Sequence, residues 1–341
     1  MKYLILKGCA GLGNRLLSLM KAIQYCNKTN RKLFVDWDDG MFADKGKNAF
    51  FSFFELKNVS YTQNKQEILN LYESGCSCYP ADLSLEEIEK DAVAMFNVVT
   101  PSISRFIPYK YLGNLLFRGK MTYVMGLQSL QRTGNGVQTY LDVLRNINKG
   151  DNMPMGGCLS KYRNEDVVMF YDARPIVNIE DISKFISPQK EILKLIDNYS
   201  AKYNLSDCVG VHVRYTDKKP WFFLSKLYKM MDRLLKDNPA QHIFLCTDNQ
   251  EIVNVFKEKY GENVFQIDKY LPNTGGQGIH DFARAKLDSQ TKEKMAMECI
   301  LDMWLLSRCK VLYWQGNSSF SYISKYLKGD PKSTINWMRL W

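Results

Sequence analysis

Apolar residues recur along this chain in a repeated order: an alternating run, a polar or glycine-containing loop, and then a run with helical spacing. The first copy opens the sequence, where KYLILK predicts a strand and GCAGLG a loop. In the following NRLLSLMKAIQYCNK, four apolar residues share one helical face: Leu16, Leu19, Met20 and Ile23. RKLFVDW predicts the next strand, so we expect a β-α-β unit with a parallel sheet.

The same order returns in the second half. ISPQKEILKLIDNYSAKY predicts a helix with Ser187 as its N-cap and Pro188 in its first turn. Strands are expected at CVGVHVRY, HIFLCT, VFQI and KVLYWQ, with helices near 223–236 and 249–259. TKEKMAMECILDMWLLSRC and SSFSYISKYLKG predict further helices, whereas NTGGQGIHDFAR, which contains His280, is expected to be a loop.

These patterns predict an α/β protein of two Rossmann-like, doubly wound domains that face each other across a cleft. We place the first domain at residues 1–180 and the second at 181–341. The segment 101–160 gives no clear pattern. In such sheets ligands bind at the carboxyl ends of the strands.

The composition fits folded domains in a reducing compartment. Of 341 residues, 45% are apolar, and no apolar run approaches the roughly 18 residues that a membrane helix needs. The apolar run Tyr3–Leu6 is too short for a secretory signal, so no leader is expected. Nine cysteines without CxxC spacing favour free thiols and a cytoplasmic location.

The formal charge of +10 is concentrated in residues 101–149, where seven Lys and Arg residues stand against Asp142 alone. Such a segment could bind nucleic acid, an anionic membrane surface or an anionic small substrate. A solvated basic surface without a partner is an equally open interpretation.

Two strands of the second half end in residues suited to an anionic ligand. On the strand VGVHV the valines share one face, so His212 and Arg214 share the other. Arg214 can donate two N–H groups to a phosphate, and Asp217 could orient it or cap the next helix. In WQGNSSFS, the hydroxyls of Ser318 and Ser319 at a helix start could cradle a phosphate. A structural Arg–Asp pair and ordinary helix capping stay open as alternatives.

Two further turns are weaker candidates. Thr247 and Asp248 end the strand HIFLCT and could simply cap the next helix. The loop GCAGLGNR offers close backbone approach to a ligand, but its G-x-x-G-x-G spacing does not match the NAD fingerprint. VDWDDG is interpreted as an ordinary strand end, so no metal site is expected.

Taken in order, these motifs identify a resemblance. The sequence resembles the GDP-fucose-dependent fucosyltransferases, most closely the bacterial nodulation enzymes that act on chito-oligosaccharides. The N-glycan core α1,6-fucosyltransferases and the protein O-fucosyltransferases are more distantly similar. The matching stretches span most of the chain: GLGNRL, VDW, NAFFSFFE, GVHVRYTDK, FLCTDN and ILDMWLLSRCKVLYWQGNSSFS.

The resemblance implies a GT-B fold whose second domain holds GDP. It implies that His212 and Asp302 address guanine or ribose and that Arg214 grips the diphosphate, with Ser318 and Ser319 completing the cradle. Asn14 and Arg15 of the first domain would reach the diphosphate or fucose from the opposite, acceptor side. The remaining donor-pocket positions are Gly11, Gly13, Asn14, Arg15, Thr247 and Asp248.

The implied reaction is metal-independent, inverting transfer of fucose from GDP-fucose to a hydroxyl of an oligosaccharide or glycan, without a further cofactor. Arg214 would stabilise the departing diphosphate. In the core α1,6 enzymes a glutamate follows the T-D-K motif, but this chain has KPWFFLSK there. Asp217 is then the nearest candidate base.

Three alternatives stay open at this stage. The same scaffold could use another nucleotide sugar, or it could be a non-catalytic homologue that holds a glycan or nucleotide. Nucleic-acid binding through 101–149 is disfavoured, because that segment contains no recognised module. Peripheral membrane association through the same segment is open, and the sequence names neither the acceptor nor the oligomeric state.

Overall fold

The computed structural model describes residues 1–8, 10–79, 83–89, 159, 162–170, 182–217, 219–276 and 278–339. They form two compact units. The first comprises the described residues within Met1–Asp39, Gly46–Phe50 and Leu56–Asn178, and the second those within Gly40–Lys45, Phe51–Glu55 and Ile179–Trp341. Two short segments of the N-terminal half thus group with the second unit, which the sequence patterns did not indicate. The basic segment 101–149 lies outside the described residues.

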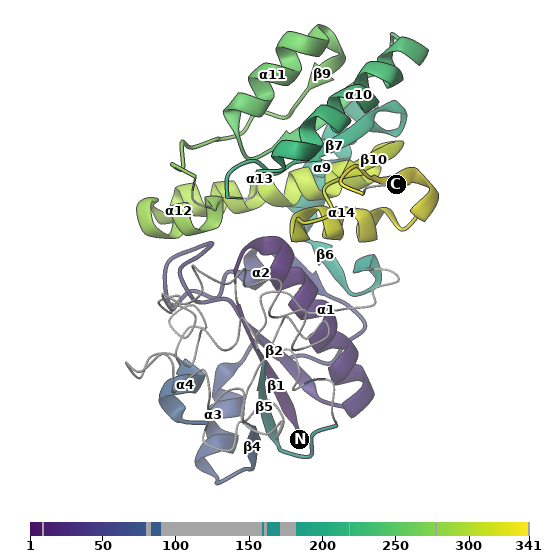
Figure 1. Ribbon diagram of the computed structural model, residues 1–341. Coiled ribbons are helices and arrows are strands. Elements are labelled where there is room, and N and C mark those ends of the chain that lie inside the picture. Colours follow the sequence, from purple (N-terminus) through teal and green to yellow (C-terminus); the bar gives the residue numbers. More distant parts are fainter. Residues whose placement is uncertain are drawn as a thin grey trace, which may run out of the picture. The chain divides into compact units, whose positions relative to one another are not determined.

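Four parallel strands form the sheet of the first unit: β1 (Tyr3–Lys7), β2 (Lys32–Asp36), β4 (Cys78–Tyr79) and β5 (Val167–Phe170). Their order is β2-β1-β5-β4 (Figure 1). Helix α1 (Leu12–Thr29) links β1 to β2 and buries all four of its predicted core residues, which confirms the β-α-β unit. The unit also contains α3 (Lys65–Glu73) and α4 (Leu85–Glu89).

Acidic side chains gather where β2 ends. Lys7 on β1 donates a hydrogen bond of 2.6 Å to Asp36 on β2, and both side chains are buried. Asp38 follows, and burial together with the neighbouring Asp36 carboxylate raises the pKa of Asp38 to about 6. VDWDDG is therefore a strand end. Lys7 neutralises the Asp36 carboxylate, whereas burial and the nearby Asp36 disfavour the ionised form of Asp38.

We expect Asp38→Asn to change how stability depends on pH. A carboxyl group whose pKa is raised on folding favours the folded state less as it ionises, so the wild type loses stability between about pH 4 and about pH 6. The asparagine amide mimics the protonated acid and removes this loss. Urea unfolding across that range should show that the free energy of unfolding of the variant rises relative to that of the wild type as pH rises. Substitution of an exposed carboxylate, Asp44→Asn, is the control. Parallel pH curves for wild type and Asp38→Asn would contradict this.

The second unit holds a five-stranded parallel sheet: β7 (Val209–Val213), β8 (Ile243–Thr247), β9 (Val264–Phe265), β10 (Val311–Trp314) and β11 (Thr334–Asn336). The order is β11-β10-β7-β8-β9, which in chain order within the unit is 3-2-1-4-5 read from β9. This is the strand order of the Rossmann dinucleotide-binding fold without its sixth strand. Its helices are α9 (Lys190–Lys202), α10 (Trp221–Asp237), α11 (Gln250–Tyr260), α12 (Ile279–Lys286), α13 (Ser289–Arg308) and α14 (Ser319–Lys328).

Helices cover both faces of this sheet (Figure 1). The valines of β7 pack into the core formed with α10 and α11. On the other face Gly210 leaves room for α13, since a Cβ atom there would lie 3.0 Å from the Sγ atom of Cys309. His212 points the same way and stacks on Phe320 of α14, with ring centroids 4.8 Å apart. The predicted division of β7 into two faces is confirmed.

Some local predictions were wrong. Ser187 and Pro188 do not open a helix; they belong to β6 (Ile186–Pro188), which pairs with β3 (Phe54–Leu56), next to the short helix α2 (Phe50–Phe53). The cap of α9 is Gln189, whose backbone N–H donates to Phe53. His280 lies on α12 rather than in a loop. For Ser187 and Pro188, pairing with the distant strand β3 overrides the local signal.

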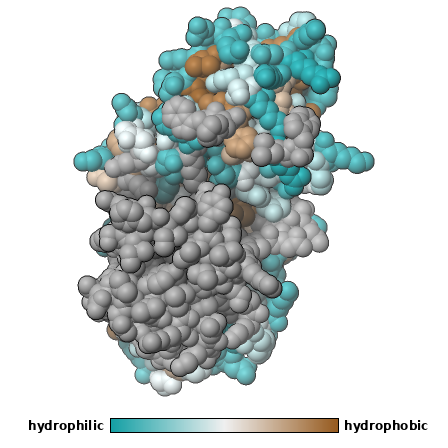
Figure 2. Space-filling view, viewed as in Figure 1, coloured by the Kyte–Doolittle hydropathy of each residue, from teal (hydrophilic) through white to brown (hydrophobic). Residues whose placement is uncertain are grey.

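The surface of the second unit over α10 and α11 is mainly hydrophilic, with smaller apolar areas (Figure 2). In the described part of the chain, no helix is both long enough and apolar enough to cross a membrane.

Candidate functional site

The carboxyl edge of the second sheet contains the point where its strand order reverses. From β7 the chain passes to β8 on one side, while β10 pairs with the other side of β7. Ligands of doubly wound folds bind at such a point, because the loops diverge and leave a crevice. Arg214 follows β7 here, and Gln315 follows β10.

Arg214 is held at this edge by carboxylates. Its Nε and Nη2 atoms each lie 2.7 Å from the Oδ1 atom of Asp217, and its Nε lies 4.0 Å from Asp248. The Arg214 side chain is 15% exposed, so it remains partly accessible at the edge of the sheet. The cap of α10 is Pro220, so Asp217 orients Arg214 and does not cap that helix.

Asp248 fixes the backbone that carries Arg214. Its two carboxylate oxygens accept hydrogen bonds of 2.6 Å from the Tyr215 backbone N–H and from the Thr216 hydroxyl. Thr247 is buried at the end of β8, and Asn249, rather than Thr247 or Asp248, caps α11. Asp248 therefore joins the loop after β7 to the end of β8, and its role in binding a donor stays a prediction.

Gln315 is a site residue that the sequence did not reveal. It is fully buried, and its Oε1 atom accepts a 2.7 Å hydrogen bond from the Arg214 backbone N–H. Its Nε2 atom donates to Asn317 at 2.8 Å, and its backbone N–H donates to Ser321 at 3.1 Å. One amide side chain thus ties the ends of β7 and β10 together across the strand reversal.

We expect Gln315→Ala to lower the free energy of unfolding by about 1–3 kcal/mol, because the partly buried Arg214 N–H loses its acceptor. Chemical denaturation measures this directly. Gln290→Ala, an exposed glutamine on α13, is the matched control and should change stability by less than about 0.5 kcal/mol. Equal effects of the two substitutions would show that the bridge contributes nothing.

The start of α14 is a further part of this edge. Ser318 occupies the N-cap position, yet its side chain makes no capping hydrogen bond. Its hydroxyl is buried and has no partner among the residues that the structure describes. Ser319 begins the helix beside it. An uncapped helix start with an enclosed, unsatisfied hydroxyl is suited to an anion.

His212 is buried beneath this edge. Its Nδ1 atom lies 2.5 Å from the Ser321 hydroxyl oxygen, which also accepts from the Gln315 N–H. Burial, together with the positive charges of Arg214 and Lys269, lowers the pKa of His212 to about 3. The ring is therefore neutral at physiological pH, so it can donate or accept hydrogen bonds but adds no charge to the site.

Asp302 lies on α13, on the same side of the sheet as His212. It is buried, and its Oδ2 atom lies 2.5 Å from the Nζ atom of Lys269. Lys269 follows β9 and was not singled out from the sequence.

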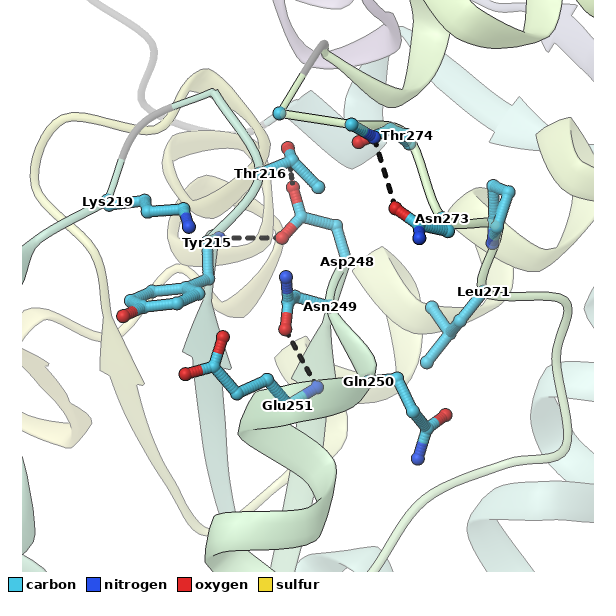
Figure 3. A pocket seen from close by; sticks show the side chains of 13 residues that line it. Tyr215, Thr216, Lys219, Asp248, Asn249, Gln250, Glu251, Leu271, Asn273 and Thr274 are labelled. Atoms are coloured by element: carbon cyan, nitrogen blue, oxygen red, sulfur yellow. Dashed lines mark hydrogen bonds between the residues drawn. The ribbon is translucent and has the colours of Figure 1, made fainter.

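A pocket of about 440 Å³ lies beside the loops that follow β7 and β8. Figure 3 shows Asp248 reaching Tyr215 and Thr216 at one wall, with Asn273 and Thr274 opposite. The backbone N–H groups of Glu251 and Ile252 already donate to Asn249, so the start of α11 is capped, in contrast to that of α14. The pocket is polar, but the capped start of α11 offers an anion less than the uncapped start of α14 does.

In the first unit, Arg15 is enclosed by its own loop. Its guanidinium pairs with Asp39 through both Nη atoms, and its Nε donates to the Ala10 carbonyl at 2.8 Å. Gly8 permits this approach, since a Cβ atom there would lie 2.0 Å from an Arg15 nitrogen.

Gly11 is the N-cap of α1, followed by Gly13 and then Asn14, whose backbone N–H donates to the Gly11 carbonyl. The Arg15–Asp39 ion pair accounts for the conformation of this loop. A donor-binding role for Gly11, Gly13, Asn14 and Arg15 stays a prediction.

No cluster of three or more metal-ligating side chains is found in the described ranges. Cys76 and Cys78 are free thiols whose Sγ atoms lie 3.7 Å apart.

Comparisons with known proteins identify the fold. No family model matches the chain. A curated relative, the serine/threonine-protein kinase pakD of Dictyostelium discoideum, is 28% identical over 109 residues, which cover 32% of this chain. The chain spans only 6% of the length of that relative, so nothing of the kinase is carried over.

Solved structures are similar over nearly the whole chain. NodZ α-1,6-fucosyltransferase soaked with GDP-fucose gives a TM-score of 0.56 at 17% identity, covering 96% of this chain and 92% of that one. NodZ from Bradyrhizobium gives 0.56 at 16% identity, with the same coverages. NodZ co-crystallised with GDP gives 0.55 at 17% identity, again covering 96% and 92%. At these identities the likeness establishes the fold, and it agrees with the family that the sequence resembles. The chain therefore has the α/β fold of two Rossmann-like units, of the GT-B class, that the NodZ fucosyltransferases share.

Proposed function

We propose that this chain is a fucosyltransferase that moves L-fucose from GDP-fucose to a hydroxyl group of an oligosaccharide or glycan. The observation that carries the proposal is that Arg214 and the uncapped start of α14 follow neighbouring strands, β7 and β10, at the strand reversal of a Rossmann-like sheet. The NodZ structures solved with GDP-fucose and with GDP, which share this fold, support the choice of donor.

In this proposal the second unit holds the donor. Arg214 and the first backbone N–H groups of α14 bind the diphosphate. The hydroxyl groups of Ser318 and Ser319 donate to it as well, which gives the enclosed Ser318 hydroxyl a partner. His212 and Asp302 address the nucleoside. Thr247 and Asp248 shape the pocket through the backbone they hold.

The chemistry follows from charge. The bond between the anomeric carbon of fucose and the GDP oxygen breaks, and the electron pair leaves with GDP while positive charge develops on the sugar. Arg214 and the helix start stabilise the departing diphosphate, so no metal ion is required. The acceptor hydroxyl attacks from the opposite side and inverts the anomeric centre.

The acceptor proton needs a destination. Asp217 is the proposed base, although its Oδ1 atom now accepts from Arg214. In such a reaction the bond to the leaving group is largely broken before the bond to the acceptor forms. The acceptor hydroxyl therefore needs only weak assistance from a base. Arg214 would shift its contacts from Asp217 to the diphosphate, which would leave the carboxylate available.

The first unit is proposed to form the acceptor side. Gly11, Gly13, Asn14 and Arg15 are the proposed donor-binding residues of this unit, with Arg15 acting through the loop that its pair with Asp39 holds. We propose that the protein works in the cytoplasm, in keeping with the free thiols of all seven cysteines in the described ranges.

Heat stabilisation by nucleotides tests the donor first, because a ligand stabilises the state that binds it. GDP and GDP-fucose should raise the unfolding temperature, and UDP, ADP and their sugars should not. Incubation with GDP-fucose and a panel of oligosaccharides should then release GDP and form a fucosylated product. Stabilisation by another nucleotide sugar, or binding of GDP-fucose without turnover on any acceptor, would overturn the proposal in favour of the corresponding alternative.

A further inference from the structure

Lys269 and Asp302 form a buried ion pair beside the sheet of the second unit. Lys269 comes from the segment after β9, and Asp302 from the middle of α13. Their side chains are 6% and 8% exposed. The next residue, Tyr270, donates its backbone N–H to Glu298, one turn before Asp302 on α13, at 3.2 Å. The segment is thus attached to α13 at two successive residues.

The pair leaves one carboxylate oxygen unused. The Oδ1 atom of Asp302 is enclosed and accepts no hydrogen bond from any residue in the described ranges. A buried carboxylate oxygen without a donor is unfavourable, so its presence in a folded protein calls for an explanation. A ligand with N–H groups to donate would provide one.

Several of the groups that face Asp302 are neutral. Cys246 faces it from β8 and Cys299 from its own helix, and burial raises the pKa of both thiols, so both stay neutral. His212 on β7 is also neutral. Glu298 adds a nearby acidic group, and Lys269 supplies the positive charge that contacts Asp302.

We propose that Lys269 is a positioning residue for base selectivity: it binds the Oδ2 atom of Asp302 and so holds the Oδ1 atom where it accepts N–H donors from the guanine of the nucleotide. This inference rests on the proposed GDP-sugar donor. Guanine presents N1–H and a 2-amino group side by side, which match the accepting oxygen of a carboxylate.

The test compares GDP with IDP, which lacks only the 2-amino group. Both carry the same diphosphate, so the ratio of their affinities reports the recognition of the base. In the wild type we expect GDP to bind about tenfold or more tightly than IDP. In Lys269→Met the Oδ2 atom of Asp302 loses its Lys269 partner, so the side chain is no longer held towards the base and the ratio should fall at least about fivefold.

Two further variants separate this role from a structural one. Lys269→Arg keeps a charged donor for the Oδ2 atom of Asp302 and should keep most of the wild-type ratio. Glu298→Gln should leave the ratio unchanged. A Lys269→Met protein that is less stable but keeps the wild-type ratio would overturn the inference, as would a wild type that does not distinguish GDP from IDP. If wild type and variants all fail to bind guanine nucleotides, the proposed function itself has failed.

Discussion

Arg214→Ala is expected to reduce kcat/KM for transfer from GDP-fucose by about a hundredfold to a thousandfold. The guanidinium is the cation at the strand reversal that stays partly accessible, and it lies where negative charge develops as GDP departs. A preorganised donor of this kind is strongest in the transition state, so most of the loss should appear in kcat. Steady-state kinetics with isotopically labelled donor would measure it.

The fold should survive this substitution. Asp217, the main partner of Arg214, has a side chain that is 30% exposed, so water can solvate it, and the free energy of unfolding should change by less than about 1 kcal/mol. Arg214→Lys keeps a charge but loses the planar fork, and should fall between wild type and alanine. Arg233→Ala removes an exposed arginine from α10 and serves as the matched control. Near-normal turnover by folded Arg214→Ala would remove Arg214 from the mechanism.

Asp39→Ala is expected to destabilise the protein by about 3–5 kcal/mol. Asp39 pairs with both Nη atoms of Arg15, and both side chains are almost fully buried. Removing the carboxylate leaves the arginine charge enclosed beside the Trp37 ring, whose centroid lies 5.3 Å from the guanidinium carbon. Denaturant unfolding measures the loss, and exposed Asp44→Ala should leave stability unchanged.

The same variant separates two roles of Arg15. If the arginine chiefly holds the glycine loop in place, stability falls first, and replacing Arg15 by Met in the Asp39→Ala background recovers part of it. If Arg15 chiefly binds the donor, the Asp39→Ala protein should instead keep its stability and show a large rise in KM for GDP-fucose. That second result would contradict the structural interpretation of the pair.

The sequence allowed the larger elements to be predicted because their signals are local. The valines of β7 alternate over five residues, and the apolar face of α1 repeats over several turns, so neither depends on a distant partner. Ser187 and Pro188 show the limit of such signals. Their residue types favour a helix start, but pairing of β6 with β3 decides their conformation.

The candidate site was predictable only in part, for the same reason. Arg214 could be found because it directly follows a recognisable strand, and Ser318 because it stands at the start of a recognisable helix. Gln315 acts on Arg214 across 101 positions of the chain, and Lys269 reaches Asp302 across 33. No local pattern marks such pairs. The roles of Gln315 and Lys269 can be recognised only in the structure, where the parallel sheet brings β7 and β10 together and α13 lies over its face.

The most direct measurement is a crystal structure of the protein with GDP bound. We predict that the diphosphate lies at the strand reversal of the second sheet and accepts hydrogen bonds from the Arg214 guanidinium and from the backbone N–H groups at the start of α14. A nucleotide bound elsewhere, or one that leaves Arg214 bonded to Asp217 and out of reach of the phosphates, would contradict it.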